Sequence, residues 1–269
     1  MTTDTSRELA AGGPLTRRER QRRATYDEIV DVARTLLRGG HEVSIRAVAG
    51  DMGLTPPALY RYVDSAAALD DLVTQHIFVD VVATMAAARD VHPEDDPAAR
   101  IVAASTAFRA WALGNPTEFR MVFASPPAPG APPKAAHTKF PLAADCPAGE
   151  SIFTDFFGEL FVQLWQQRRF PVPSRESLDP AVVAVWEEAG SARQATAELF
   201  GDDGIGVLWL FELAWARLYG IVTLEVFGHV DPVLIASGAM FRAVILEIGT
   251  TLGMADEWER LRDIAGYSG

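Results

Sequence analysis

The side chains best suited to chemistry gather in one short segment of the chain. Pro56, Pro57, Tyr60, Arg61 and Tyr62 supply two rigid apolar rings, two phenols and one guanidinium. A guanidinium can bind a phosphate, a phenol can form a hydrogen bond to a base edge, and an apolar ring can contact a thymine methyl group. The segment therefore suits contact with a DNA groove, provided that these side chains point outward.

Two predicted helices position this segment. A first helix is predicted from residue 45 to residue 52, because apolar residues recur there at helical spacing and Ser44 can cap its start. Gly53 follows, where a helix end favours a residue that adopts the left-handed conformation. A second helix begins at once, because Thr55 is a capping residue and Pro56 suits the first helical position. Such a pair forms a helix-turn-helix, whose second helix enters the major groove, although any helical hairpin can show this pattern.

Four motifs carry a more specific signal. They are Ile-Val-Asp-Val-Ala at 29–33, Ser-Ile-Arg-Ala-Val-Ala at 44–49, Met-Gly-Leu at 52–54 and Ala-Leu-Tyr-Arg-Tyr-Val at 58–63. Together they resemble the DNA-binding domain of the TetR family of transcriptional regulators. The resemblance implies DNA contacts from Ser44, Arg46, Thr55, Pro56, Pro57, Tyr60, Arg61 and Tyr62. Members of the family usually have a phosphate-binding lysine at the start of the fourth helix, where this chain has Ala66.

The charge is unevenly distributed along the chain. The 269 residues carry a net charge of −12, which opposes binding to a polyanion. From Leu15 to Tyr62, nine arginines face six acidic residues, a balance of +3, so the remainder carries −15. A basic head on an acidic body can orient the molecule on DNA, although chance scatter of charge would look similar. The arginines clustered at 17–23 form either an arm that reaches phosphates or the minor groove, or a solubilising helix start.

The length and the apolar content predict two domains. A chain of 269 residues exceeds the usual size of one domain, and its 49% hydrophobic content is ample for a core. We expect a disordered tail over residues 1–14, a helix-turn-helix domain over 15–80 and a second domain over 81–255. A long helix, capped by Asp64 or Ser65 and ending near Arg89, joins the two domains. No stretch shows sustained two-residue alternation, so the predicted fold class is all-α.

The second domain is predicted to contain six helices. They are expected at Ala99–Leu113, Pro116–Ala124, Glu150–Arg169, Pro180–Phe200, Gly206–Phe227 and Pro232–Leu252. The segment from Ser125 to Gly149 contains seven prolines and two glycines, so we expect a surface loop there, either a functional lid or a disordered segment.

The last two predicted helices are strongly apolar. Glu212, Arg217 and Glu225 interrupt the first of them before a membrane-spanning run of about 20 residues accumulates, so we expect no membrane association. Its apolar stripe is formed by Leu208, Phe211, Trp215, Leu218 and Val222. Both helices could pair with the same helices of a second copy in a four-helix bundle. The TetR resemblance implies the same homodimer, whose two heads would meet half-sites about 34–36 Å apart.

A second resemblance covers parts of the predicted second domain. The segments at 215–225 (Trp-Ala-Arg-Leu-Tyr-Gly-Ile-Val-Thr-Leu-Glu), 107–111 (Ala-Phe-Arg-Ala-Trp) and 115–123 (Asn-Pro-Thr-Glu-Phe-Arg-Met-Val-Phe) are similar to the Trp-His-Gly type of TetR effector domain, with Tyr219 in place of histidine. The resemblance implies a bound small molecule. Aromatic residues that could line its pocket are Trp111, Phe119, Phe123, Phe153, Phe157, Trp165 and Trp209, with polar groups from Arg109, Arg120 or Gln163. Aromatic residues at helical spacing are more often core residues, so the ligand is predicted only as apolar or aromatic.

The sequence contains no recognisable catalytic or metal-binding motif. Gly-x-Ser-x-Gly, His-Glu-x-x-His, a phosphate loop and Cys-x-x-Cys are all absent, and the five histidines are scattered. We therefore expect no enzymatic activity, no metal and no cofactor. The single Cys146 cannot form an intrachain disulfide, and the start of the chain lacks the apolar run of a signal peptide. Both features are typical of a cytoplasmic protein.

These features lead to one principal hypothesis. The protein is expected to be a cytoplasmic homodimeric regulator, a repressor that a small hydrophobic effector releases from a pseudo-palindromic operator. An activator and a regulator that responds to a partner protein are alternatives. A helical scaffold without DNA binding is a further alternative, because Ala66 replaces the family lysine.

Overall fold

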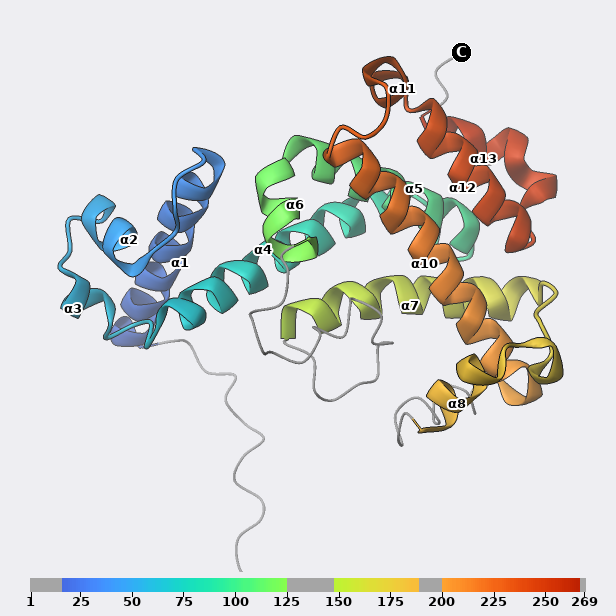
Figure 1. Ribbon diagram of the computed structural model, residues 1–269, viewed down its shortest axis with the longest axis horizontal. Helices are drawn as coiled ribbons and strands as arrows, with labels where there is room; N and C mark the ends of the chain where they lie inside the picture. Colours follow the sequence, from blue (N-terminus) through green and yellow to red (C-terminus); the bar gives the residue numbers. More distant parts are fainter. Residues whose placement is uncertain (1–15, 125–147, 189–199, 267–269) are drawn as a thin grey trace, which may run out of the picture. The chain divides into compact units, whose positions relative to one another are not determined.

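The computed structural model describes residues 16–124, 148–188 and 200–266, and every regular element within these ranges is a helix (Figure 1). The predicted all-α class is therefore confirmed. The chain divides into two compact units, Met1–Val73 and Thr74–Gly269. This division lies within helix α4 (Ala66–Arg89), the helix in which the sequence analysis also placed a domain boundary. The predicted tail over 1–14, Cys146 and nearly all of the predicted loop over 125–149 lie outside the described residues.

Helix α1 (Arg17–Arg38) begins the first unit. Thr16 and Glu19 form a capping box at its start, in which each side chain accepts a hydrogen bond from the backbone N–H of the other residue. Its buried side chains are Ile29, Val30 and Ala33, which lie well beyond the clustered arginines. Those arginines therefore occupy the first turns of a helix. Contact between them and DNA phosphates stays a prediction.

Helices α2 (Ile45–Asp51) and α3 (Pro56–Leu59) follow at the predicted places. The Ser44 hydroxyl caps α2 by accepting a hydrogen bond from the N–H of Ala47 at 3.3 Å. Gly53 has φ +66°, the left-handed conformation expected where the first helix ends. Leu59 and Val63 are buried, as the predicted orientation of the second helix requires.

The start of α3 differs from the expectation in one respect. Thr55 occupies the capping position, but its side chain makes no capping hydrogen bond. A capping hydroxyl normally binds the second or third N–H of a helix. Pro57 has no N–H, and the N–H of Ala58 already donates to the Thr55 carbonyl at 2.9 Å. The hydroxyl therefore stays exposed at the surface.

The second unit contains the rest of α4 and the helices that follow. These are α5 (Pro97–Gly114), α6 (Pro116–Phe123), α7 (Ala148–Arg168), α8 (Pro180–Glu188), α10 (Gly204–Val226), α11 (Pro232–Ser237), α12 (Ala239–Thr251) and α13 (Trp258–Ile264). Helix α10 is central, because it packs against α5, α7 and α12 (Figure 1). Only the first part of the helix predicted over 180–200 is described, because residues 189–199 lie outside the described ranges.

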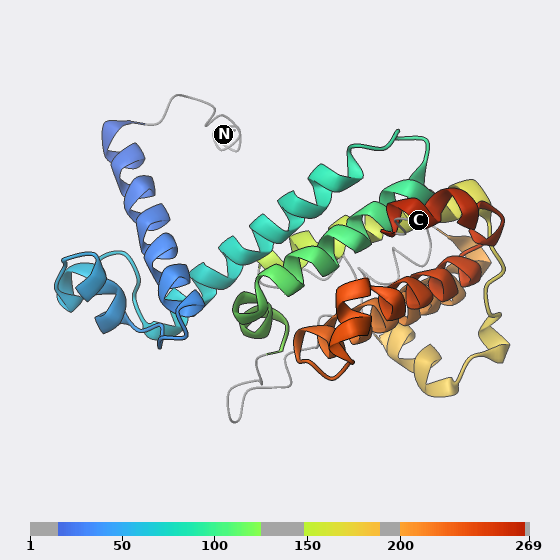
Figure 2. The same ribbon diagram turned by 90° about the horizontal axis from the view of Figure 1, so that it is seen from above.

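The end of the chain departs from the predicted pattern. The single helix expected over 232–252 is two helices, α11 and α12, separated by Gly238 with φ +67°. A side chain at this position would be strained, so the glycine permits the break. Beyond the predicted domain end, α13 lies along α5 (Figure 2). Periodicity alone could not locate the break, because the apolar spacing continues on both sides of it.

Acidic and basic side chains connect α13 to the helices beneath it. Arg260 binds both Asp96, which caps α5, and Glu257, and Arg168 of α7 binds Glu257 as well. Hydrogen bonds from Arg260 are the largest influence on the Glu257 carboxyl, and with those from Arg168 they hold its pKa below the ordinary value. The network ties three separate parts of the second unit together.

Among the residues that the structure describes, two helical stretches, α4 and Gly201–Val226, are long and apolar enough to cross a membrane by length and composition. In α10 the predicted stripe of Leu208, Phe211, Trp215, Leu218 and Val222 is buried within the unit. The apolar character of α10 is therefore explained by its central position in a helical core. The same burial means that this stripe cannot be the surface that meets a second copy.

Candidate DNA-binding surface and apolar cavity

The structure brings most of the predicted DNA contacts to one exposed region of the first unit. Arg46, Thr55, Pro56, Pro57, Tyr60 and Arg61 are exposed, whereas Ser44 and Tyr62 are partly buried. Half of the Tyr60 surface is accessible to solvent. Within the described residues, neither Arg46 nor Arg61 forms an ion pair, so both guanidinium groups are available to phosphates.

Helix α3 forms only a single turn, and the chain continues from it in turn conformation. The N–H of Tyr60 donates to the Pro56 carbonyl at 3.0 Å, and the N–H of Tyr62 donates to the Leu59 carbonyl at 2.9 Å. The two prolines at the start of α3 have a backbone angle that suits a helix, and because they have no N–H they leave no unpaired donor there. The exposed face therefore combines rigid proline rings with the phenol of Tyr60.

Tyr62 has a neighbour that the sequence analysis did not identify. The Tyr26 hydroxyl donates to the Tyr62 carbonyl at 3.0 Å, and the two rings meet edge to face with centroids 5.8 Å apart. Arg22 donates to the same hydroxyl at 3.2 Å, a hydrogen bond that raises the pKa of Arg22. The four-residue spacing of Arg22 and Tyr26 would have indicated their contact. The contact to Tyr62, 36 residues further along the chain, had no signal in the sequence.

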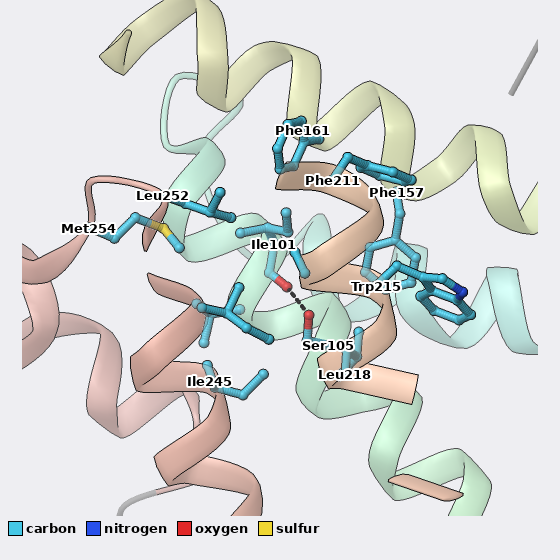
Figure 3. A pocket seen from close by; sticks show the side chains of 13 residues that line it. Ile101, Ser105, Phe157, Phe161, Phe211, Trp215, Leu218, Ile245, Leu252 and Met254 are labelled. Atoms are coloured by element: carbon cyan, nitrogen blue, oxygen red, sulfur yellow. Dashed lines mark hydrogen bonds between the residues drawn. The ribbon is translucent and has the colours of Figure 1, made fainter. Parts of the chain in front are cut away.

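The second unit contains a small, partly open apolar cavity of about 50 Å³ (Figure 3). Its lining residues come from α5, α7, α10, α12 and the turn after α12. They are Ile101, Val102, Ser105, Phe157, Phe161, Phe211, Ala214, Trp215, Leu218, Ile245, Ile248, Leu252 and Met254. Ser105 is the one residue in this lining with a polar side chain, and its hydroxyl donates to the Ile101 carbonyl at 2.8 Å. The lining therefore suits an apolar ligand and supplies no charge.

The aromatic residues predicted to line a pocket mostly have another position. Of the seven, Phe157 alone lines this cavity. Phe119, Phe123 and Phe153 pack around Phe108 with ring centroids 5.3–6.2 Å from it, and Trp111 packs against Phe123. Trp165 packs against Phe170, and Trp209 is partly buried on α10. Lining residues on α12 and the following turn were missed, because their position depends on the break at Gly238.

The three polar residues predicted for the pocket also lie elsewhere. Arg120 is exposed, with its guanidinium over the ring of Phe227, and Gln163 is exposed on α7. Arg109 of α5 binds the buried carboxylate of Glu225 on α10 through two hydrogen bonds of 2.6 and 3.1 Å. It also donates to the Ile235 carbonyl of α11 at 2.6 Å. This ion pair therefore connects three helices of the second unit.

A capped helix-turn-helix unit followed by a helical unit with an apolar cavity defines a class of protein, the helix-turn-helix transcriptional regulators with a helical second domain. Residues 101–248, more than half of the chain, match the tetracyclin repressor-like C-terminal domain family. The chain belongs to this family and is a transcriptional regulator of the TetR type. The resemblance that the sequence analysis drew from the first 80 residues is thereby confirmed from a different part of the chain.

Individual relatives agree with this assignment. HTH-type transcriptional regulators of Mycobacterium tuberculosis and Mycobacterium bovis are 28% identical to the chain over 214 residues, which cover 75% of the chain and 80% of each relative. The crystal structure of SCO4313, described as a regulatory protein, has a TM-score of 0.56 and 22% identity, and covers 87% of this chain and 98% of that one. This structural likeness concerns the fold alone.

Proposed function

We propose that the protein is a cytoplasmic, homodimeric repressor that a small apolar effector releases from a pseudo-palindromic operator. The observation that carries the proposal is the exposed surface formed by Arg46, Tyr60 and Arg61 on the helix-turn-helix of α2 and α3. We assign DNA binding to the first unit and effector binding and dimerisation to the second. The remaining proposed DNA contacts are Ser44, Thr55, Pro56, Pro57 and Tyr62.

DNA binding is tested with Arg46→Ala and Tyr60→Ala. Both variants should lose affinity for a duplex that the wild-type protein enriches from a randomised library, and both should keep the wild-type melting temperature, because both side chains are exposed. Arg175→Ala, an exposed arginine of the second unit, is the matched control. Unchanged affinity in both variants would reject the proposed contacts, and a wild-type protein without DNA affinity would favour the scaffold alternative.

The apolar cavity is the proposed effector site. A ligand that weakens operator binding 100-fold must prefer the released conformation by about 2.7 kcal/mol, within the usual range of coupling free energies. Ala214→Leu places extra volume in the cavity, and Ala110→Leu adds the same volume at an exposed position of α5. In a thermal-shift screen of hydrophobic compounds, a ligand that stabilises the wild-type and Ala110→Leu proteins and releases their DNA should fail with Ala214→Leu. Equal responses from all three proteins would place the effector elsewhere.

The proposed dimer uses α10 and α12, the helices that the sequence analysis took as the last two. Their core-facing stripes are covered within the unit, so the outward sides remain for a second copy. Leu224 of α10, Phe227 directly after it and Met240 of α12 are exposed apolar residues, and Gly220 of α10 has open space around it. Leu224→Glu should convert the dimer to a monomer in analytical ultracentrifugation, with Val185→Glu, another exposed apolar position, on α8, as control. A dimer that survives Leu224→Glu would exclude this surface.

A further inference from the structure

The amino-terminal turns of α1 have no role in the core of the first unit. All residues from Thr16 to Ala24 are exposed, and the buried residues of α1 begin at Ile29. If α1 only supported the core, it could begin after Ala24 without losing a buried residue among those that the structure describes. The exposed turns nevertheless begin with a complete capping box, which fixes their conformation.

One column of side chains on α1 runs from these turns toward the end of α3. Arg18, Arg22 and Tyr26 recur at intervals of four residues, so they share one face of the helix. This face continues into the buried residues Ile29 and Val30. The side of α1 that packs onto the core therefore becomes a cationic side in the turns before Ile29, with the partly buried Tyr26 between the two parts.

The Tyr26 hydroxyl fixes this cationic side beside the end of the recognition segment. It donates to the Tyr62 carbonyl at 3.0 Å and accepts a hydrogen bond from Arg22 at 3.2 Å, while the Arg22 guanidinium lies 5.6 Å from the Tyr26 ring centroid. A guanidinium has five N–H donors, and the described residues offer Arg22 no other hydrogen-bond partner. The nearby acid Glu19 is occupied by Thr16.

We propose that the first turns of α1 form a second contact to the DNA backbone, in which Arg22 binds a phosphate and Tyr26 is the residue that positions it. The proposal rests on the proposed DNA-binding function and adds a sequence-independent contact to it. A phosphate contact of this kind positions the protein on the duplex and carries no base information. It also gives the first unit a cation that binds the DNA backbone, whereas its fourth helix begins with Ala66 in place of the family lysine.

The salt dependence of binding provides the test. The logarithm of the binding constant falls with the logarithm of the salt concentration by about 0.9 for each neutralised phosphate. Full-length protein is titrated with two probes, the duplex enriched from a randomised library and a mixed-sequence duplex of the same length. Arg22→Gln should reduce the slope by about 0.9 per bound head on both probes. Arg38→Gln removes the same charge about 24 Å away along α1, at 1.5 Å per residue, and should leave the slope unchanged.

Tyr26→Phe isolates the positioning role, because it keeps the ring and removes the hydroxyl. A single hydrogen bond of this kind contributes a factor of roughly 2 to 12, so affinity should fall by that factor while the fold and the dimer persist. In the Arg22→Gln background the same substitution should cost less affinity, because only the hydrogen bond to the Tyr62 carbonyl is then lost. Additive losses would overturn the positioning role of Tyr26.

The failure of this proposal can be distinguished from that of the proposed function. If the wild-type protein binds neither duplex, the DNA-binding function itself is wrong. If the wild-type protein binds and Arg22→Gln behaves as Arg38→Gln does, the second backbone contact alone is wrong. If both variants reduce the slope equally, the effect is one of net charge, and the assignment of a phosphate to Arg22 is again refuted.

Discussion

The ion pair between Arg109 and Glu225 provides a quantitative test of the second unit. The Glu225 side chain is completely buried, and 17% of the Arg109 side chain is exposed. Replacing Arg109 by Met keeps most of the apolar stem and removes the guanidinium. The variant then leaves the Glu225 carboxylate without its cation and the Ile235 carbonyl without its donor.

The expected loss follows from this geometry. Breaking a buried ion pair by removing one partner costs about 3–5 kcal/mol, because an uncompensated charge is left in the interior. The near-complete burial of Glu225 places the pair within that range, and no discount for solvent screening is needed on the side of the carboxylate. A unit of this size changes its melting temperature by about 2–4 °C per kcal/mol. Arg109→Met should therefore lower the melting temperature by roughly 6–20 °C.

A double-mutant cycle decides whether the pair or the packing is responsible. Arg109→Met, Glu225→Met and the double variant are compared by urea denaturation of the full-length protein. The double variant should be more stable than Arg109→Met alone, because replacing both partners by apolar groups removes the buried charge. If the two single losses simply add in the double variant, the ion pair does not couple α5 to α10 and the reasoning is refuted.

The remaining predictions concern packing and acid sensitivity. Gly206→Ala should destabilise the second unit by about 1–3 kcal/mol in urea denaturation, because its Cβ would lie 2.2 Å from the Pro173 carbonyl oxygen. Gly220→Ala is the control: its Cβ meets no atom within 4 Å, so it should not destabilise α10. Glu257, whose pKa is lowered from 4.5, should stabilise the fold above that pH, and this stabilisation should disappear as the pH falls through the lowered value. Denaturation curves between pH 6 and 3 should therefore show a smaller acid loss for Glu257→Gln than for the wild type, and identical pH profiles would contradict the network with Arg260.

The helix-turn-helix could be predicted because its signals are local. Ser44, Gly53 and Pro56 each act within one helical turn of their position, and the structure places all three where the sequence requires them. The failure at Thr55 is also local, since Pro57 lacks the second N–H and the N–H of Ala58 donates to the Thr55 carbonyl. The start of α3 was predicted correctly, but whether Thr55 forms a capping hydrogen bond also depends on the second residue of the helix, Pro57.

The break at Gly238 could not be predicted from periodicity. Both α11 and α12 keep helical spacing of apolar residues, and Gly238 is tolerated inside many helices at a cost of about 1 kcal/mol. The structure shows why the break persists: Arg109 donates to the Ile235 carbonyl just before it, and Arg242 binds the Ser237 carbonyl. Two arginines thus satisfy carbonyls at the end of α11, and the contact from Arg109, 126 residues away in the chain, is not visible in a local window.

The cavity was harder to predict than the DNA surface for a physical reason. A binding surface on a short helix depends on which side chains face outward, and the apolar positions of that helix determine this directly. A cavity depends on where several helices leave volume unfilled, which residue type does not determine. Phe153 and Phe157 are separated by one turn of α7 and are similarly buried, yet Phe153 packs against Phe108 while Phe157 lines the cavity. The difference arises from their partners on α5 and α10, so aromatic type identifies candidates for a pocket and only the packing of these helices selects among them.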